Sequence, residues 1–93
     1  MRIIITEGTQ FDASYQELSR QEIDVSSDMS IGDLLEIAKT LPFQMLNAPY
    51  SKNIINHLYL MHPESRDRLE ESKTIKEYGF EDGSIVRLMS GVR

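Results

Sequence analysis

The stretch from residue 68 to residue 89 constrains the fold of this chain more than any other part of it. Thr74 followed by Glu77 is a capping pair, which predicts a single helical turn that ends near Tyr78. The sequence Glu-Asp-Gly at residues 81–83 predicts a tight turn, because glycine adopts positive φ without strain. The apolar residues 85–89 then predict a final strand. This fixed order of elements narrows the fold far more than composition does.

The first third of the chain predicts two strands joined by a long connection. Three consecutive isoleucines within residues 2–6 favour a strand, because β-branched side chains fit a pleated surface. Residues 21–26 alternate between apolar and charged side chains, the period of a half-buried strand. Residues 8–19 are polar and turn-rich, with Phe11 and Tyr15 as their aromatic groups. We expect them to form the hairpin connection.

A helix of about 11 residues is predicted next, from the spacing of its apolar residues. Ser30 followed by Asp33 resembles a capping box at its start. Pro42 is expected to end it, since proline disfavours helix in the residue before it. The apolar residues recur at three- and four-residue steps and form one stripe: Ile31, Leu34, Leu35, Ala38 and Leu41.

The remaining elements complete a mixed domain. Residues 43–56 are too apolar for a solvated loop, and we expect them to pack at the sheet edge, with a short helical turn. Residues 57–61 predict a third strand and residues 68–70 a very short further one. Two strands, a helix and two or three strands predict a single α+β domain over residues 1–93, with one main helix packed on one face of a mixed sheet of four to five strands.

Bulk properties exclude several classes of function. The net charge of −5 argues against nucleic-acid binding, which needs a basic stripe. No apolar run approaches the roughly 20 residues that span a bilayer, so no membrane insertion is expected. The chain starts with strand-like residues and no signal-peptide core, which predicts a cytoplasmic location.

Nothing in the sequence predicts catalysis, a metal or a cofactor. The chain has no cysteine, which excludes disulfides, thiolate catalysis and cysteine-ligated zinc. His57 and His62 lie five residues apart on a predicted strand and would face opposite ways, so a shared metal is not expected. Gly79 and Gly83 fit turns rather than a phosphate loop. We therefore expect no enzymatic activity and no small-molecule substrate.

With this order of elements, the chain resembles ubiquitin and its relatives over essentially its whole length. Residues 74–78 are the most specific piece of the likeness, and the resemblance implies a β-grasp fold. Residues 78–89 are most similar to the YukD/EsaB group, small bacterial ubiquitin-like proteins of type VII secretion systems. That resemblance implies a non-enzymatic protein-interaction module, an accessory or regulatory component of such a system.

The last residues bear on an alternative role. A ubiquitin-type modifier needs a flexible Gly-Gly tail that activating enzymes can thread, whereas this chain ends with Ser-Gly-Val-Arg. Conjugation is therefore not expected. The alternative is a modifier that is conjugated after C-terminal processing at Gly91.

The resemblance also predicts where a protein partner binds. The third and last strands are neighbours in a β-grasp sheet, and strand alternation divides their side chains between two faces. If leucines 58 and 60 point inward, Tyr59 and Met61 point outward, together with Arg87 and Met89. Aromatic, Met and Arg side chains are enriched in interface cores. Two alternatives stay open: residues 43–56, or the first connection with its aromatic residues, cover this face, or a one-residue slip exchanges the faces.

Overall fold

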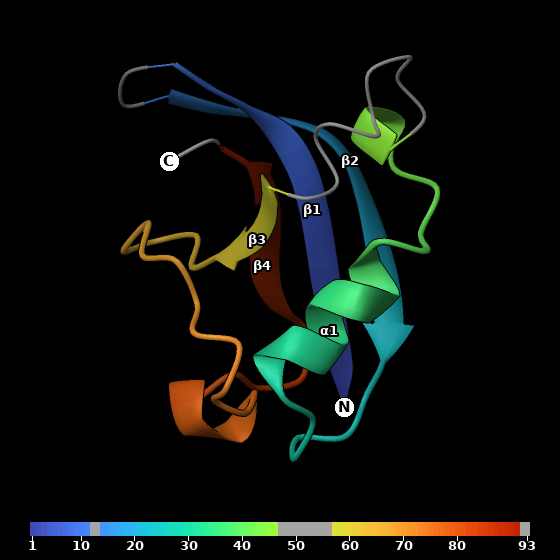
Figure 1. Cartoon of the computed structure of the whole chain (residues 1–93), viewed down its shortest axis with the longest axis vertical. Coiled ribbons are helices and arrows are strands. Elements are labelled where there is room, and N and C mark those ends of the chain that lie inside the picture. Colours follow the sequence, from blue (N-terminus) through green and yellow to red (C-terminus); the bar gives the residue numbers. More distant parts are fainter. Residues whose placement is uncertain (12–13, 47–56, 92–93) are drawn as a thin grey trace.

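The computed structural model describes residues 1–11, 14–46 and 57–91, which form a mixed sheet with one helix against it (Figure 1). Strands β1 (Arg2–Phe11) and β2 (Ser14–Asp24) come first, followed by helix α1 (Ile31–Ala38). Strands β3 (Leu58–Met61) and β4 (Ser84–Ser90) complete the sheet, and its order is β2-β1-β4-β3. Strand β4 pairs parallel with β1 and antiparallel with β3, so the predicted α+β class with a mixed sheet is confirmed.

The first hairpin is longer than the sequence predicts. Strands β1 and β2 pair from Arg2 and Asp24 out to Phe11 and Ser14, so the prediction of a connection over residues 8–19 was wrong. The side chains of β2 are exposed or half-buried along the whole strand. Residues 14–20 of β2 have no buried side chain on either face and so carry no alternating apolar signal, which is why this half of the strand was expected to be a loop. Further along β2, Ile23 packs against the core and gives the alternation seen in residues 21–26.

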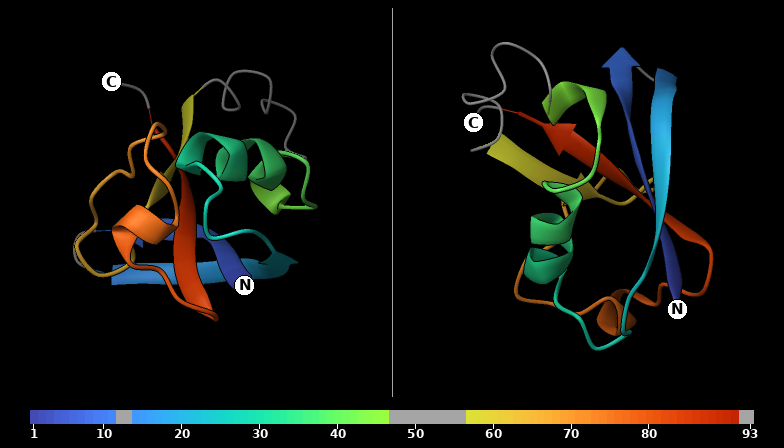
Figure 2. Two further views of the ribbon diagram at one scale, coloured as in Figure 1. Left: turned by 90° about the horizontal axis from the view of Figure 1, so that it is seen from below. Right: turned by 90° about the vertical axis from the view of Figure 1, so that its right-hand side faces the viewer.

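The helix packs on one face of the sheet through the predicted stripe. The Ser30 hydroxyl caps the helix, accepting a hydrogen bond from the Asp33 N–H at 3.1 Å. The buried residues of α1 are Ile31, Leu34, Leu35 and Ala38, which join Ile3, Ile5, Val86 and Leu88 in one core. Figure 2 shows α1 lying on a single side of the sheet.

The helix is shorter than predicted. It ends at Ala38, because the N–H groups of Thr40 and Leu41 bond to carbonyls three residues back, which tightens the last turn. Phe43 then enters the core with no exposed surface, and Gln44–Leu46 form the expected short helical turn. The rest of the predicted apolar segment, residues 47–56, lies outside the described residues.

The second half of the chain departs from one prediction and agrees with another. A fourth strand over residues 68–70 is not formed, since Arg68 makes only an isolated bridge to Met61. Lys76–Tyr78 form the predicted helical turn, and the Thr74 hydroxyl accepts a hydrogen bond from the Glu77 N–H at 3.1 Å. Within the described residues, no helix is long and apolar enough to cross a membrane.

A buried carboxyl group ties β1 to the segment after the helix. Glu7 is 1% exposed, on the same strand face as Ile3 and Ile5. Its Oε2 accepts a hydrogen bond from the Gln44 N–H at 2.7 Å, at the start of the short turn Gln44–Leu46. A buried polar group is tolerated only when it is hydrogen-bonded. Glu7 therefore holds the chain that follows Phe43 against the sheet.

Replacing Glu7 with Ala should destabilise the protein, because the Gln44 N–H would lose its buried acceptor. We expect the free energy of unfolding in urea to fall by about 2 kcal/mol. The matched control is Glu36→Ala, which removes an exposed acid whose Oε1 lies 3.1 Å from the Lys39 ammonium. That control should cost less than about 0.5 kcal/mol. Equal losses in the two variants would show that Glu7 is not the tie described here.

Candidate interaction surface

The face of the sheet turned away from α1 is the candidate site, and we call it the outer face. Val86 and Leu88 of β4 belong to the core under α1, whereas Arg87 and Met89 alternate with them and point the other way. Leu58 and Leu60 of β3 likewise lie in the core. The register predicted from the sequence is therefore the one the sheet adopts.

The pairing of β3 with β4 brings the four predicted partner-binding residues together. Tyr59 lies opposite Met89, and Met61 lies opposite Arg87. Tyr59, Arg87 and Met89 are half-buried, so part of each side chain is offered to solvent. Met61 is only 5% exposed, contrary to the expectation that it presents a contact surface. It lies beneath the surface instead and can only form its floor.

Tyr15 is a member of the outer face that the sequence indicated only through the alternative in which the first connection covers this face. Its hydroxyl lies 3.1 Å from the Thr6 hydroxyl, and the Arg87 guanidinium carbon stacks 3.8 Å from its ring centroid. Gly8 permits this approach, since a Cβ there would stand 2.8 Å from the tyrosine ring. The alternative that the first connection covers this face is thus realised in part, by Tyr15. The side chain of Phe11 lies outside the described residues.

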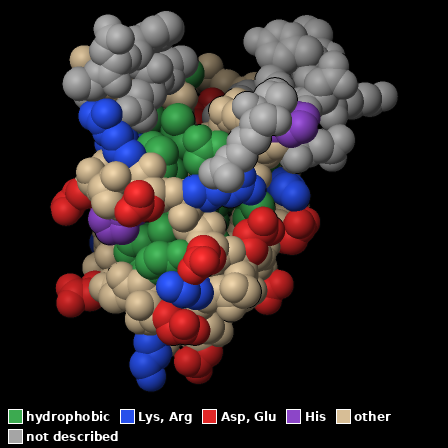
Figure 3. All heavy atoms as spheres, turned by 60° about the vertical axis from the view of Figure 1, so that its left-hand side comes forward, with side chains coloured by type: hydrophobic (Ala, Val, Ile, Leu, Met, Phe, Trp, Pro, Cys, Tyr) green, Lys and Arg blue, Asp and Glu red, His purple; other side chains and the backbone are tan. Residues whose placement is uncertain are grey.

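Arg68 flanks the same surface from the opposite side. It forms a bridge with Met61, and its guanidinium carbon lies 5.0 Å from the centroid of the Tyr59 ring. Figure 3, which brings the left-hand side of Figure 1 forward, shows apolar side chains at the surface among basic and acidic groups. The sequence did not place Arg68 on this surface, because a short strand predicted over residues 68–70 does not say which strand it lies beside.

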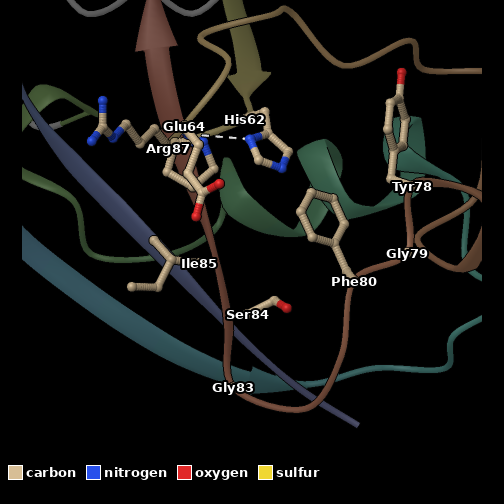
Figure 4. A pocket seen from close by; sticks show the side chains of 10 residues that line it. His62, Glu64, Tyr78, Gly79, Phe80, Gly83, Ser84, Ile85 and Arg87 are labelled. Atoms are coloured by element: carbon tan, nitrogen blue, oxygen red, sulfur yellow. Dashed lines mark hydrogen bonds between the residues drawn. The ribbon is translucent and has the colours of Figure 1, made fainter.

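An open groove of about 500 Å³ adjoins the outer face beyond the end of β3. Its walls include His62 and Phe80, whose rings stack with centroids 5.7 Å apart. His62 Nδ1 accepts the N–H of Glu64 at 3.1 Å, so a neutral ring carries its proton on Nε2. In Figure 4 the Arg87 side chain extends away from these two rings. The histidine is thus held by packing and by its loop.

The described residues contain no group of three or more metal-ligating side chains close enough to hold an ion. The groove has one carboxyl group, Glu64, and its serine hydroxyl, Ser84 Oγ, accepts a hydrogen bond from the Glu81 N–H at 2.8 Å. Among these lining residues, the His62 ring and the Ser84 hydroxyl each accept a hydrogen bond from a backbone N–H, and no hydrogen bond joins the side chains of His62, Glu64 and Ser84 to one another. What the geometry supports is a surface for contact with another molecule.

Comparison with known proteins shows the fold. No family model matches the sequence, and no curated protein matches it. Among solved structures, the ubiquitin of Caldiarchaeum subterraneum is similar with a TM-score of 0.67 at 17% identity, covering 100% of this chain and 95% of that one. The ubiquitin-like domain of Plasmodium falciparum Dsk2 is similar with a TM-score of 0.62 at 13% identity, covering 98% and 97%. The fold is therefore a ubiquitin-like β-grasp, as predicted.

The contacts of Tyr15 predict an alkaline titration. Burial, assisted by the charges of Glu17 and Glu7, raises the pKa of its phenol above the ordinary 10.0, against the opposite effects of the Thr6 hydrogen bond and the Arg87 charge. Because the pKa is raised in the folded state, the resulting stability is present below pH 10 and is lost as the pH rises through the folded-state value. An ultraviolet absorbance titration should show a late-ionising phenol that Tyr15→Phe removes and that unfolding in urea abolishes. A late phenol that persists in Tyr15→Phe would contradict the assignment.

Proposed function

We propose that this chain is a non-enzymatic protein-interaction module that docks through its outer face. The contact residues are Tyr59, Arg87 and Met89, with Met61 as the floor beneath them. The observation that carries the proposal is the register of β3 against β4. Two residue pairs between these strands place an aromatic ring, a guanidinium and a thioether close together and half-buried, on the face opposite α1. Ubiquitin-like domains are generally non-enzymatic and act as protein-interaction or modifier domains, which agrees with this role.

The composition of this surface suits a docking role. Aromatic, Met and Arg side chains are enriched in the cores of protein interfaces, and Met adapts to varied partners. The side chains project from paired strands, so little order has to be gained when a partner binds. Tyr59 is additionally held by Arg68, whose guanidinium carbon lies 5.0 Å from its ring centroid. A surface that is already ordered loses less entropy on association.

The biological setting that we propose is a cytoplasmic accessory or regulatory component of a bacterial secretion system of type VII. The support is the likeness of residues 78–89 to the YukD/EsaB group. In the structure these residues are the end of the one-turn helix, the turn at Gly83 and most of β4. The proposed partner is a protein, neither a nucleic acid nor a membrane.

A conjugated modifier, released by processing at Gly91, is the other role that the same fold serves. The Gly91 N–H donates a hydrogen bond to the His57 carbonyl at 3.1 Å, and the residue lies against the Tyr59 ring. This position counts against the modifier role, because activation requires the final glycine to leave the sheet. Intact mass of the protein from cells separates the two roles: adducts joined through Gly91 would favour the modifier.

The docking proposal predicts that Tyr59→Ser combined with Met89→Ser abolishes partner capture. Both side chains are half-buried rather than core residues, so each substitution should cost about 1 kcal/mol or less. The protein should therefore stay folded, with a thermal midpoint lowered by no more than about 8 to 16 °C. The measurement is the amount of partner that the tagged protein retains from the cells that produce it. The matched control is Leu18→Ser, which removes an apolar side chain that is 48% exposed and has no cross-strand partner in the hairpin.

Capture should fall at least about 10-fold in the double variant, because truncating central interface residues typically costs 2 kcal/mol or more. The Leu18 control should bind as the parent does. If the double variant retains its partner while keeping its fold, the outer face is not the docking surface.

A further inference from the structure

A row of arginines crosses the outer face at one level of the sheet. Arg68 pairs with Met61, Met61 pairs with Arg87, Arg87 pairs with Thr6, and Thr6 pairs with Arg20. Residues paired across strands lie on the same face, so the three arginines point the same way. The two residues between them, Met61 and Thr6, are 5% and 1% exposed. The row is therefore a cationic stripe over a floor that excludes water.

Two acidic residues of β2 beside this stripe, Glu17 and Glu22, are already engaged. Glu17 binds Arg20 with two hydrogen bonds of 2.9 and 2.8 Å. Glu22 lies 3.8 Å from the Arg2 guanidinium at the far end of the hairpin. The part of the outer face that β2 contributes is thus neutralised by its own ion pairs.

Arg68 and Arg87 differ from these residues. Among the described residues, neither of the two has a carboxylate within ion-pair distance. Each instead lies over a tyrosine ring, at 5.0 Å from the Tyr59 centroid for Arg68 and at 3.8 Å from the Tyr15 centroid for Arg87.

Stacking on a ring leaves the edge of a guanidinium free. The ring holds the planar group in a fixed orientation, while the N–H groups at its edge still point outward and can bind a carboxylate through two parallel hydrogen bonds. An arginine that is already held on a ring has lost much of its rotamer entropy before binding, so less entropy is lost when a partner binds. Arg68 and Arg87 are therefore oriented for anions before any partner arrives.

We propose that the partner of the outer face is an acidic and apolar protein segment that places one carboxylate on Arg68 and another on Arg87. Each arginine is the neighbour of Met61 on one side, so their Cα atoms are about 10 Å apart, two sheet spacings. Helix residues seven apart are separated by a similar distance, about 10.5 Å. An apolar side chain between the two acids would then pack over Met61 and against Tyr59.

This inference rests on the docking role of the outer face and adds the chemistry of the partner. Phosphate groups of a nucleic acid could also bind two guanidinium groups. The net charge of −5 opposes the binding of a nucleic acid, which carries many negative charges. The buried Met61 between the arginines favours an apolar side chain over a sugar-phosphate backbone. A protein segment fits both observations.

Three probes test the proposal. The first is a synthetic helical peptide with two glutamates seven residues apart and leucines between them, and the second has glutamine in place of both glutamates. The third is a single-stranded oligonucleotide. Binding to the full chain is measured by fluorescence anisotropy, and the site by NMR shifts of the Tyr59 and Met89 amides. The glutamate peptide should bind about 10-fold more tightly than the glutamine peptide, a difference of about 1.4 kcal/mol.

Variants then assign the carboxylates to the two arginines. Arg68→Gln and Arg87→Gln should each lower affinity for the glutamate peptide about 5- to 10-fold, and should lower affinity for the glutamine peptide by a smaller factor, so that the two peptides bind more nearly alike. Arg87→Lys keeps the charge but loses the planar edge, so most of the affinity should still be lost. Lys39→Gln is the control. It also removes one positive charge, but Lys39 lies at the end of α1, on the other side of the sheet, and is paired with Glu36.

The outcomes separate the inference from the docking role. Equal binding of both peptides at Tyr59 and Met89 would retain the docking face but overturn the pairing of acids with Arg68 and Arg87. Failure of the glutamate peptide to bind at these amides would overturn the inference, while partner capture decides the docking role independently. Arginine-dependent binding of the oligonucleotide in preference to the peptide would overturn the choice of a protein partner.

Discussion

The packing of one short helix on one face of the sheet determines the rest of this structure. Helix α1 offers a single buried stripe, Ile31, Leu34, Leu35 and Ala38, which contacts the inward side chains of the strands. Burying a large apolar side chain contributes about 2 kcal/mol, so this stripe and its partners supply much of the favourable free energy of folding. A helix of eight residues cannot also cover the second face. The domain therefore has one core and one face that its only described α-helix leaves open.

Strand alternation determines which side chains the open face presents. Because side chains alternate along β4, burial of Val86 and Leu88 on one face turns Arg87 and Met89 toward the other. The hairpin covers part of this face with Tyr15, which fixes Arg87 by stacking instead of hiding it. The outer face is thus neither core nor ordinary solvated surface. It is a half-buried mixture of rings, a thioether and guanidinium groups, ordered in advance by neighbours within the same sheet.

The sequence predicted the parts of the fold in which one face is buried, because burial imposes a period of 3.6 or 2 on apolar residues. It predicted neither the hairpin over residues 8–19, where both faces of β2 are wet, nor the end of α1, which a tightened turn decides. At the site, it placed Tyr59, Arg87 and Met89 on one face from alternation alone. The burial of Met61 and the stack of Tyr15 on Arg87 depend on contacts between distant parts of the chain, which no local pattern encodes.

The central claim is that the outer face is open to solvent at Met89 and closed at Met61. The most direct test is paramagnetic relaxation of the methionine methyl groups by a soluble gadolinium chelate, since relaxation depends on how closely the chelate approaches. Strong relaxation of the Met89 methyl and weak relaxation of the Met61 methyl are the results that this account predicts, from a half-buried and a 5% exposed side chain. Protection of Met89 equal to that of Met61 would show that the chain covers this face itself and would contradict the account.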